Sequence, residues 1–262
     1  SFENYKKTEG LDSQLKEDAL IRLGDSYFAI RNYNKAIESY QKVSQNFVSS
    51  SDYAQYQIGM SYGFLEDNKS KIKVLSNVIN EYDTSILIDD ALFQLANTYT
   101  ITKNNKKAHL AYNQLIEKHP NSVFIPKALV RQGLLYYNDN QNQKALEKFK
   151  RTTREFPNSP DAFEAAANAK NIYIDDDNLD AYINWVKTLK FINVTNSDLD
   201  NTTFAVAEKK YFEAKKYVNI VKSLTKYVQS FPDGIHKLKA NYYLADVLHK
   251  MKRFDKSIPY YQ

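Results

Sequence analysis

The stretch "LGDSYFAIRNYNKAIESYQKV", residues 23–43, decides the fold because its residue types return in the same order farther along the chain. A second copy, "QGLLYYNDNQNQKALEKFKRT", occupies residues 132–152. In each copy a Gly is followed three residues later by a Tyr, and a polar turn then leads to an Ala and an aromatic residue. A pattern that returns at a fixed spacing indicates a repeat protein, whose stacked units share a core.

The pattern continues through two further copies, so that four residue types can be read in register. The small position holds Gly24, Gly59, Ala96 and Gly133. Three residues later stand Tyr27, Tyr62, Tyr99 and Tyr136. The next two positions hold Ala36, Lys71, Ala108 and Ala145, and then Tyr40, Leu75, Tyr112 and Phe149. These units start near residues 17, 52, 89 and 126, which gives a period of 35 to 37 residues.

Each position has a physical reason. Small residues let two antiparallel helices approach closely, and the aromatic residues fill the space between one pair and the next. Short polar segments such as "RNYN" form the turn between the two helices. Pro120 and Pro157 follow the second helix of their units, where proline prevents the helix from continuing.

This combination of marks resembles the tetratricopeptide repeat (TPR) family. Weaker units follow near residues 162, 201 and 238, so the resemblance extends over about residues 17–262. It implies an all-α fold, a right-handed superhelical solenoid of antiparallel helix pairs with about six and a half to seven units. We expect one domain over residues 1–262, cut from a longer array, with an irregular junction at residues 190–201.

Composition narrows the possible functions. Six Gly and six Pro in 262 residues argue against a β protein rich in turns. The absence of Cys excludes a disulfide framework and thiolate catalysis. No apolar run is long enough to predict a transmembrane helix, so membrane association would need an anchor or partner outside this chain. The net charge of +5 comes from scattered lysines, which indicates a solvated helical surface.

No motif predicts an active site. The four histidines, at positions 109, 119, 236 and 249, do not form a metal-binding pattern. Residues 175–180, "DDDNLD", lack the Gly and the distal Glu of a calcium loop. The sequence therefore predicts a protein that is not an enzyme, with no catalytic residue, no cofactor and no metal site.

The resemblance instead points to the concave groove, which the first helix of each TPR unit lines. Aromatic residues recur at these positions and suit a surface that holds an extended peptide or a partner helix. The predicted partner-binding residues are Phe28, Tyr53, Tyr56, Met60, Phe64, Phe93, Asn97, Lys127, Arg131, Tyr137, Tyr173 and Tyr242.

One family subtype can be compared residue by residue. Chaperone-binding members hold a C-terminal carboxylate with a set of Lys, Asn and Arg side chains. Lys127 and Arg131 match the last pair of that set, but Gln94, Tyr56 and Met60 stand where the other polar residues should be. We therefore do not expect binding of EEVD-type tails.

The segments between units resemble those of bacterial envelope TPR proteins. "EFPNSPDAFEAA" and "HPNSVFIPKAL" follow the pattern of the lipoprotein that assists outer-membrane β-barrel assembly and of the periplasmic coordinator of the Tol–Pal system. This resemblance implies a periplasmic or outer-membrane-associated protein of a bacterium, with a cytoplasmic location as the alternative.

The favoured function is a non-catalytic scaffold that binds a peptide or partner protein. One alternative is an RNA-binding helical-repeat protein, which the protein-binding marks and the lack of paired base-reading residues disfavour. Another is a regulatory arm of a larger multidomain protein. We expect a protein or peptide partner and no nucleic acid.

Overall fold

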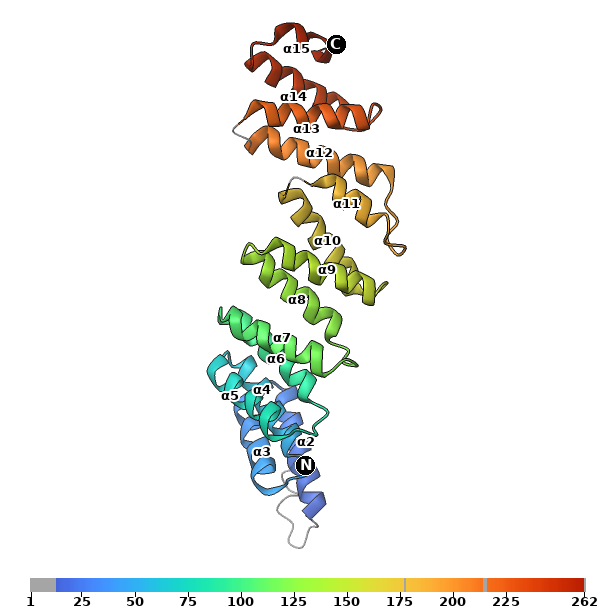
Figure 1. Ribbon diagram of the computed structural model, residues 1–262. Helices are drawn as coiled ribbons and strands as arrows, with labels where there is room; N and C mark the ends of the chain where they lie inside the picture. The colour runs from blue at the N-terminus through green and yellow to red at the C-terminus, as the bar shows by residue number, and fades with distance from the viewer. Residues whose placement is uncertain (1–12, 177, 214–215, 262) are drawn as a thin grey trace. The chain divides into compact units, whose positions relative to one another are not determined.

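The computed structural model describes residues 13–176, 178–213 and 216–261. Within these residues every regular element is an α-helix, which confirms the all-α solenoid (Figure 1). The chain divides into two compact units, residues 1–162 and 163–262, which are described separately. The organisation as a single domain over residues 1–262 stays a prediction.

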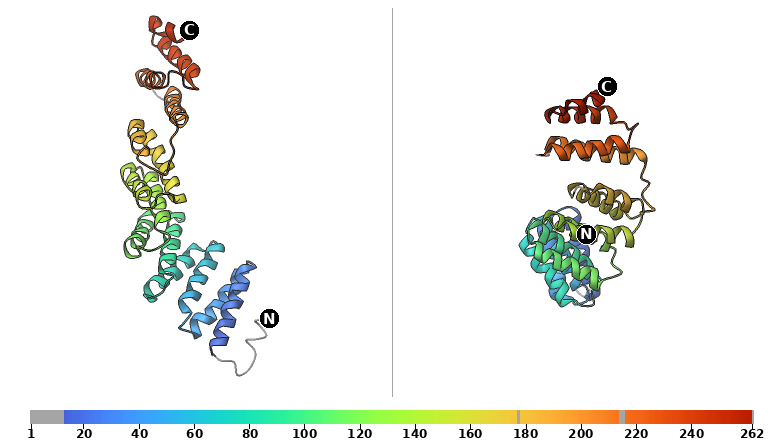
Figure 2. Two further views of the ribbon diagram at one scale, coloured as in Figure 1. Left: turned by 90° about the vertical axis from the view of Figure 1, so that its right-hand side faces the viewer. Right: turned by 45° about the horizontal axis from the view of Figure 1, so that its top comes forward.

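The first unit is a stack of four helix pairs. Its helices are α2 (Ser13–Ala29), α3 (Tyr33–Asn46), α4 (Ser51–Phe64), α5 (Asn68–Glu81), α6 (Ile88–Ile101), α7 (Asn105–Lys118), α8 (Ile125–Asn138) and α9 (Asn142–Glu155). Each helix packs against the next along the chain, and because short turns join them, neighbours run antiparallel (Figure 2). This arrangement confirms the helix pairs that the repeat predicts.

The turn inside each pair uses one residue in the left-handed region. Arg31, Glu66, Lys103 and Asn140 all have φ between 57° and 62°, which reverses the chain two residues after the end of the first helix. In three pairs the next residue then caps the second helix: the side chains of Asn32, Asp67 and Asn104 accept hydrogen bonds from backbone N–H groups three residues on. Gln141 of the fourth pair makes no such bond.

The small position is required by close approach between the two helices of a pair. A Cβ atom on Gly24 would lie 2.5 Å from Cε1 of Tyr40, and one on Gly133 would lie 2.6 Å from Cε1 of Phe149. Such distances are far inside van der Waals contact, so a larger residue would push the helices apart. The packing role that the sequence predicts for this position is confirmed.

The two aromatic positions of the repeat differ in burial. Tyr40, Tyr112 and Phe149 of the second helices are fully buried. Tyr136, which belongs to the first-helix series, is only half-buried, and its ring stacks on His109 with centroids 4.1 Å apart. The second-helix position therefore carries the core of each pair.

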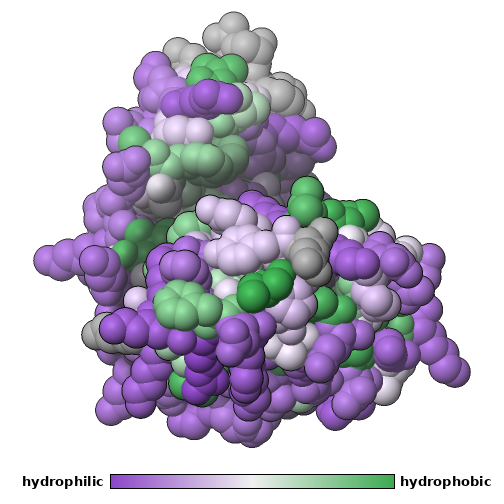
Figure 3. All heavy atoms as spheres, turned by 90° about the horizontal axis from the view of Figure 1, so that it is seen from above, coloured by the Kyte–Doolittle hydropathy of each residue, from purple (hydrophilic) through white to green (hydrophobic). Residues whose placement is uncertain are grey.

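The second unit comprises most of α10 (Pro160–Asp175) together with five further helices. These are α11 (Leu179–Val186), α12 (Asn196–Glu213), α13 (Tyr217–Ser230), α14 (Lys237–Lys250) and α15 (Phe254–Tyr261). Its main core cluster joins α12, α13 and α14 around the fully buried Leu224, Tyr227 and Leu244. In the view of Figure 3, apolar side chains lie in small groups among hydrophilic ones.

The predicted junction at residues 190–201 is only partly irregular. No helix covers residues 187–195, but α12 begins at Asn196, earlier than the unit start expected near residue 201. The Thr195 hydroxyl accepts from the Asp198 backbone N–H at 3.1 Å, and Asp198 Oδ2 accepts from the Thr195 backbone N–H at 3.0 Å. This reciprocal cap fixes the start of α12. Among the described helices, none is both long and apolar enough to cross a membrane.

Candidate binding groove

A cavity of about 590 Å³ lies along α6 and α8 in the first unit, and we call it the groove cavity. It is lined by Phe93, Gln94, Asn97, Thr100, Ile101, Tyr112, Lys127, Arg131, Leu134, Leu135 and Asn138. The structure thus brings together four of the predicted partner-binding residues, which are Phe93, Asn97, Lys127 and Arg131.

The apolar side of the groove cavity belongs to the core as much as to the surface. Phe93 is only 5% exposed, and its ring stacks on Phe124 with centroids 4.9 Å apart. It also meets the edge of Tyr112 at 6.4 Å. Replacing Phe93 would disturb the fold together with any binding, so it is a poor residue on which to test the groove.

A hydrogen bond orients the amide of Asn97 at this cavity. Its Oδ1 atom accepts from the hydroxyl of Tyr112 at 2.7 Å. This bond fixes the orientation of the amide, whose NH2 group then remains to donate to a ligand. Burial raises the pKa of Tyr112 to about 12, although the Thr100 hydroxyl and the Arg131 guanidinium oppose the shift. Tyr112 is therefore a neutral donor at ordinary pH.

The charged residues that line the groove cavity are all positive. Lys127 and Arg131 lie one turn apart on α8, where both are exposed. Neither forms an ion pair with a carboxylate of the described residues, and no Asp or Glu belongs to the cavity lining. Two cations, several amides and an apolar wall thus face the same space.

Several lining residues were not predicted as partner-binding residues. Ile101 lies four residues after Asn97, and Asn138 lies four residues after Leu134. Residues at this spacing share one helix face, so extending the groove positions by one turn would have found them. Tyr112 belongs to a second helix, which sequence reasoning assigned to the core alone.

The predicted residues nearer the N-terminus form an aromatic group outside the groove cavity. The Phe28 and Phe64 rings meet edge to face at 5.4 Å, and Tyr33 stacks on Phe64 at 4.9 Å. Phe64 is 56% exposed, so this group keeps an accessible aromatic surface.

Tyr53 and Tyr56 serve the packing of the repeats. The hydroxyl of Tyr53 donates to Oδ1 of Asp25 at 2.8 Å. Tyr56 packs against the core cluster of α5 and α6, and burial raises its pKa to about 12. Met60 and Tyr137 are half-buried and do not line the groove cavity.

The remaining two predicted residues belong to the second unit. Tyr173 is only 6% exposed and lies 6.1 Å from Trp185, ring to ring. Tyr242 is 58% exposed beside Tyr243. The predicted binding role of each remains untested.

A second cavity, which sequence reasoning missed, has a volume of about 280 Å³. Residues of α5, α6 and α7 line it, among them Ile79, Leu95 and Leu110. Their side chains make its wall largely apolar. Within the described residues, no group of three or more His, Asp or Glu side chains is placed to hold a metal ion.

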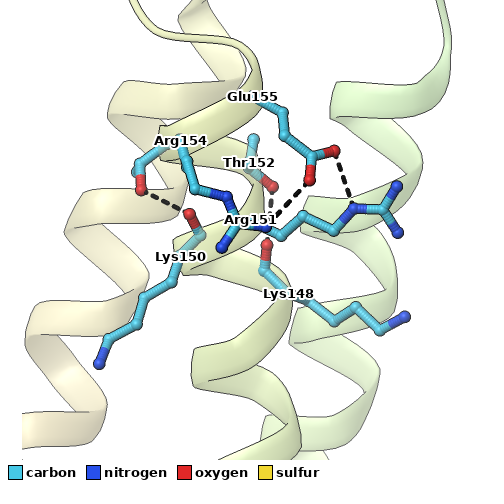
Figure 4. Close-up of polar contacts among 7 residues, drawn as sticks. Lys148, Lys150, Arg151, Thr152, Arg154 and Glu155 are labelled. Atoms are coloured by element: carbon cyan, nitrogen blue, oxygen red, sulfur yellow. Dashed lines mark hydrogen bonds and ion pairs between the residues drawn. The ribbon is translucent and has the colours of Figure 1, made fainter.

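Helix α9 carries a basic surface that is partly neutralised. Glu155 accepts from Nε of Arg151 at 2.8 Å and from Nη2 of Arg154 at 3.0 Å (Figure 4). Burial and the neighbouring Arg151 lower the pKa of Lys148, while Glu117 and Glu147 act in the opposite direction. The cations of α9 therefore have carboxylates nearby, unlike those of the groove cavity.

Comparison with known proteins gives a family-level match. The model of the tetratricopeptide repeat matches residues 18–50, 53–85, 90–122 and 127–159, just over half of the chain. These four matches coincide with the four helix pairs of the first unit. A search of curated proteins finds no match.

Solved structures resemble the chain in fold. The apo form of RapI is 12% identical, covers 99% of this chain and 76% of its own, and has a TM-score of 0.62. A tetratricopeptide repeat protein from Parabacteroides merdae is 14% identical, covers 93% and 90%, and has a TM-score of 0.56. MamA from Desulfovibrio magneticus is 14% identical, covers 67% and 94%, and has a TM-score of 0.53. At these identities the likeness concerns the fold alone.

Proposed function

Because the chain belongs to the tetratricopeptide repeat family, we propose that it is a non-catalytic scaffold that holds a segment of a partner protein in the groove cavity. TPR repeats are protein-interaction modules, and the observation that carries the proposal here is the convergence of four predicted residues on one cavity of about 590 Å³. A cavity of this size accommodates a few side chains of a bound segment.

The lining offers the contacts that an extended segment needs. The NH2 group of Asn97 can donate to a backbone carbonyl, and Asn138 offers a second amide one helix away. Ile101 and Leu134 provide apolar surface for a side chain of the segment. Hydrogen bonds to the backbone would fix the register of the segment, and the apolar wall would contribute affinity.

Site-specific photo-crosslinking in the native host tests this proposal. A photoreactive amino acid at Ile101, which is 68% exposed, should give a discrete adduct with a partner protein. Val48 is the matched control, since it is 93% exposed but lies outside the groove cavity. The same adducts from both positions, or an adduct from Val48 alone, would argue against groove binding.

The envelope location belongs to the same proposal. It is supported by the inter-unit segments "EFPNSPDAFEAA" and "HPNSVFIPKAL", which resemble those of bacterial envelope TPR proteins. Fractionation of cells that express the full-length protein with an epitope tag should recover it with the periplasm or outer membrane. Recovery with the cytoplasm would contradict the location without affecting groove binding.

A further inference from the structure

Lys71 occupies a position that the other clear repeats fill with alanine. Ala36, Ala108 and Ala145 are fully buried, and Lys71 is only 9% exposed. An amino group at such a position costs free energy unless it gains an interaction, because burial disfavours its charged form. Desolvation accordingly lowers the pKa of Lys71. A residue this costly at an alanine position calls for a functional explanation.

The amino group of Lys71 does not itself line the groove cavity, but it contacts a residue that does. Nζ of Lys71 donates to Oε1 of Gln94 at 3.2 Å, and Gln94 lines that cavity. The side chain passes Gly63, where a Cβ atom would lie 3.1 Å from Nζ. Within the described residues, Lys71 forms no ion pair with a carboxylate. Its charge is thus buried without a counterion beside a cavity that already contains two cations.

We infer that the groove cavity selects acidic segments, with an Asp or Glu side chain of the partner binding Lys127 and Arg131 directly and compensating the charge of Lys71 through Gln94. This inference rests on the proposed function and specifies the chemistry of the partner. A carboxylate accepts several charge-assisted hydrogen bonds at once, and the lining contains no carboxylate that would compete with it. Gln94, oriented by Lys71, offers its NH2 group to the same ligand.

The acidic group is an internal side chain of the segment rather than a C-terminal carboxylate. Tyr56 and Met60 stand where TPR proteins that bind C-terminal tails place polar residues, and the structure leaves both half-buried. The cations lie beside Ile101 and Leu134 instead. This arrangement suits an acidic residue flanked by an apolar one.

Fluorescence binding to capped peptides tests the inference. The probe is an acetylated and amidated peptide that alternates Glu and Leu, and the comparison peptide has Gln in place of every Glu. The Glu peptide should bind the wild-type chain about tenfold or more tightly than the Gln peptide. Its affinity should fall as salt rises.

Two variants identify the residue responsible. Lys71→Met removes the amino group while keeping most of the side-chain volume, and it should weaken binding of the Glu peptide about tenfold. Lys148→Met is the matched control, because Lys148 also has a pKa lowered by burial, whereas only Lys71 donates a hydrogen bond to a residue that lines the groove cavity. Circular dichroism spectra of both variants confirm that each is folded.

Each outcome decides the inference. Equal binding of the Glu and Gln peptides would overturn the acidic preference while leaving groove binding intact. Equal losses in Lys71→Met and Lys148→Met, or no binding of the Glu peptide, would also overturn it. Failure of the proposed function itself would appear separately, as the absence of a specific crosslink at Ile101.

Discussion

The two helices of a pair in the first unit contact each other in one of two ways, through a hydrogen bond or through apolar side chains alone. In α2–α3 and α6–α7 a tyrosine of the second helix donates a hydrogen bond to the first helix: Tyr40 to Asp25, and Tyr112 to Asn97, each at 2.7 Å. The acceptor directly follows the small residue of the repeat in both pairs.

In α4–α5 and α8–α9 the same two positions are apolar. Leu75 and Phe149 replace the tyrosines, and Met60 and Leu134 replace the acceptors. Leu75 and Phe149 are fully buried. The difference teaches that a polar residue at this first-helix position accompanies a tyrosine in the core, so its presence alone does not indicate a ligand contact.

The two kinds of helix pair meet at the groove cavity, because α6 belongs to a hydrogen-bonded pair and α8 to an apolar pair, and both helices line this cavity. Asn97 presents an amide there because its oxygen serves Tyr112, while Leu134 presents an apolar side chain. The chemistry of the groove is therefore partly set by the residues that close each pair.

The largest loss of stability is expected when the buried ring of an apolar pair is removed. Phe149→Ala should reduce the free energy of unfolding by about 3–5 kcal/mol, because it removes a fully buried ring and leaves a cavity. Urea denaturation monitored by circular dichroism measures the loss. Val48→Ala, at a 93% exposed site, should change stability by less than about 0.5 kcal/mol. If Phe149→Ala lost no more stability than Val48→Ala, the assignment of Phe149 to the core would be contradicted.

A transplanted polar pair tests the comparison itself. Phe149→Tyr alone should destabilise the chain by about 1–3 kcal/mol, because it buries a hydroxyl without an acceptor. Adding Leu134→Asn should recover about 1–2 kcal/mol of that loss, because the new amide oxygen can accept from the new hydroxyl, just as Asn97 accepts from Tyr112. A double-mutant cycle from denaturation curves measures the coupling, and additive losses would show that the pairing is incidental.

The free energy of unfolding should depend on pH through His109, which lies on α7 and stacks on Tyr136 of α8. Burial lowers the pKa of His109, whose ring nitrogens are both buried without a hydrogen-bond partner in the described structure. Asp139 opposes this shift, while Lys148 and Lys144 reinforce it. The unfolded chain takes up the proton at a pH near the ordinary value of about 6.5, so stability should fall as the pH drops below that value.

His109→Phe isolates this contribution. The variant should show a shallower decline of the free energy of unfolding between neutral pH and the lowered pKa of the folded histidine. An unchanged slope in denaturation curves across this range would assign the pH dependence to other groups.

The smallest effect concerns the helix cap that distinguishes the fourth pair. Gln141 lacks the side-chain cap that Asn104 provides to α7. Gln141→Asn should stabilise the chain by about 0.5–1 kcal/mol, since asparagine is a preferred residue at this position. Thermal unfolding measures the gain. The control is Gln143→Asn, at the second residue of α9, which should not stabilise the chain.

Much of the fold could be predicted from the sequence because each repeat position has a distinct packing role. Gly24 and Gly133 could be recognised from their spacing to Tyr40 and Phe149, and the structure shows the close approach that this spacing implies. The repeat spacing predicts a unit start near residue 201, whereas the cap formed by Thr195 and Asp198 begins α12 at Asn196.

The binding site was predictable in position but less so in chemistry. Lys127 and Arg131 could be placed on the groove because they follow the repeat register, and both line its cavity. The burial of Phe93 and the engagement of Asn97 with Tyr112 could not be foreseen, because both depend on contacts between different helices. The same limit hid the path of Lys71 to Gln94.

Charge reversal at the groove tests the central claim most directly. The double variant Lys127→Glu with Arg131→Glu should abolish the partner crosslink from Ile101 while the chain stays folded, because it places negative charge at the groove cavity. The control Lys42→Glu with Lys73→Glu makes the same change in net charge at exposed sites outside that cavity, and it should retain the crosslink. A crosslink that survives reversal at the groove, or that is lost equally in both variants, would contradict the account.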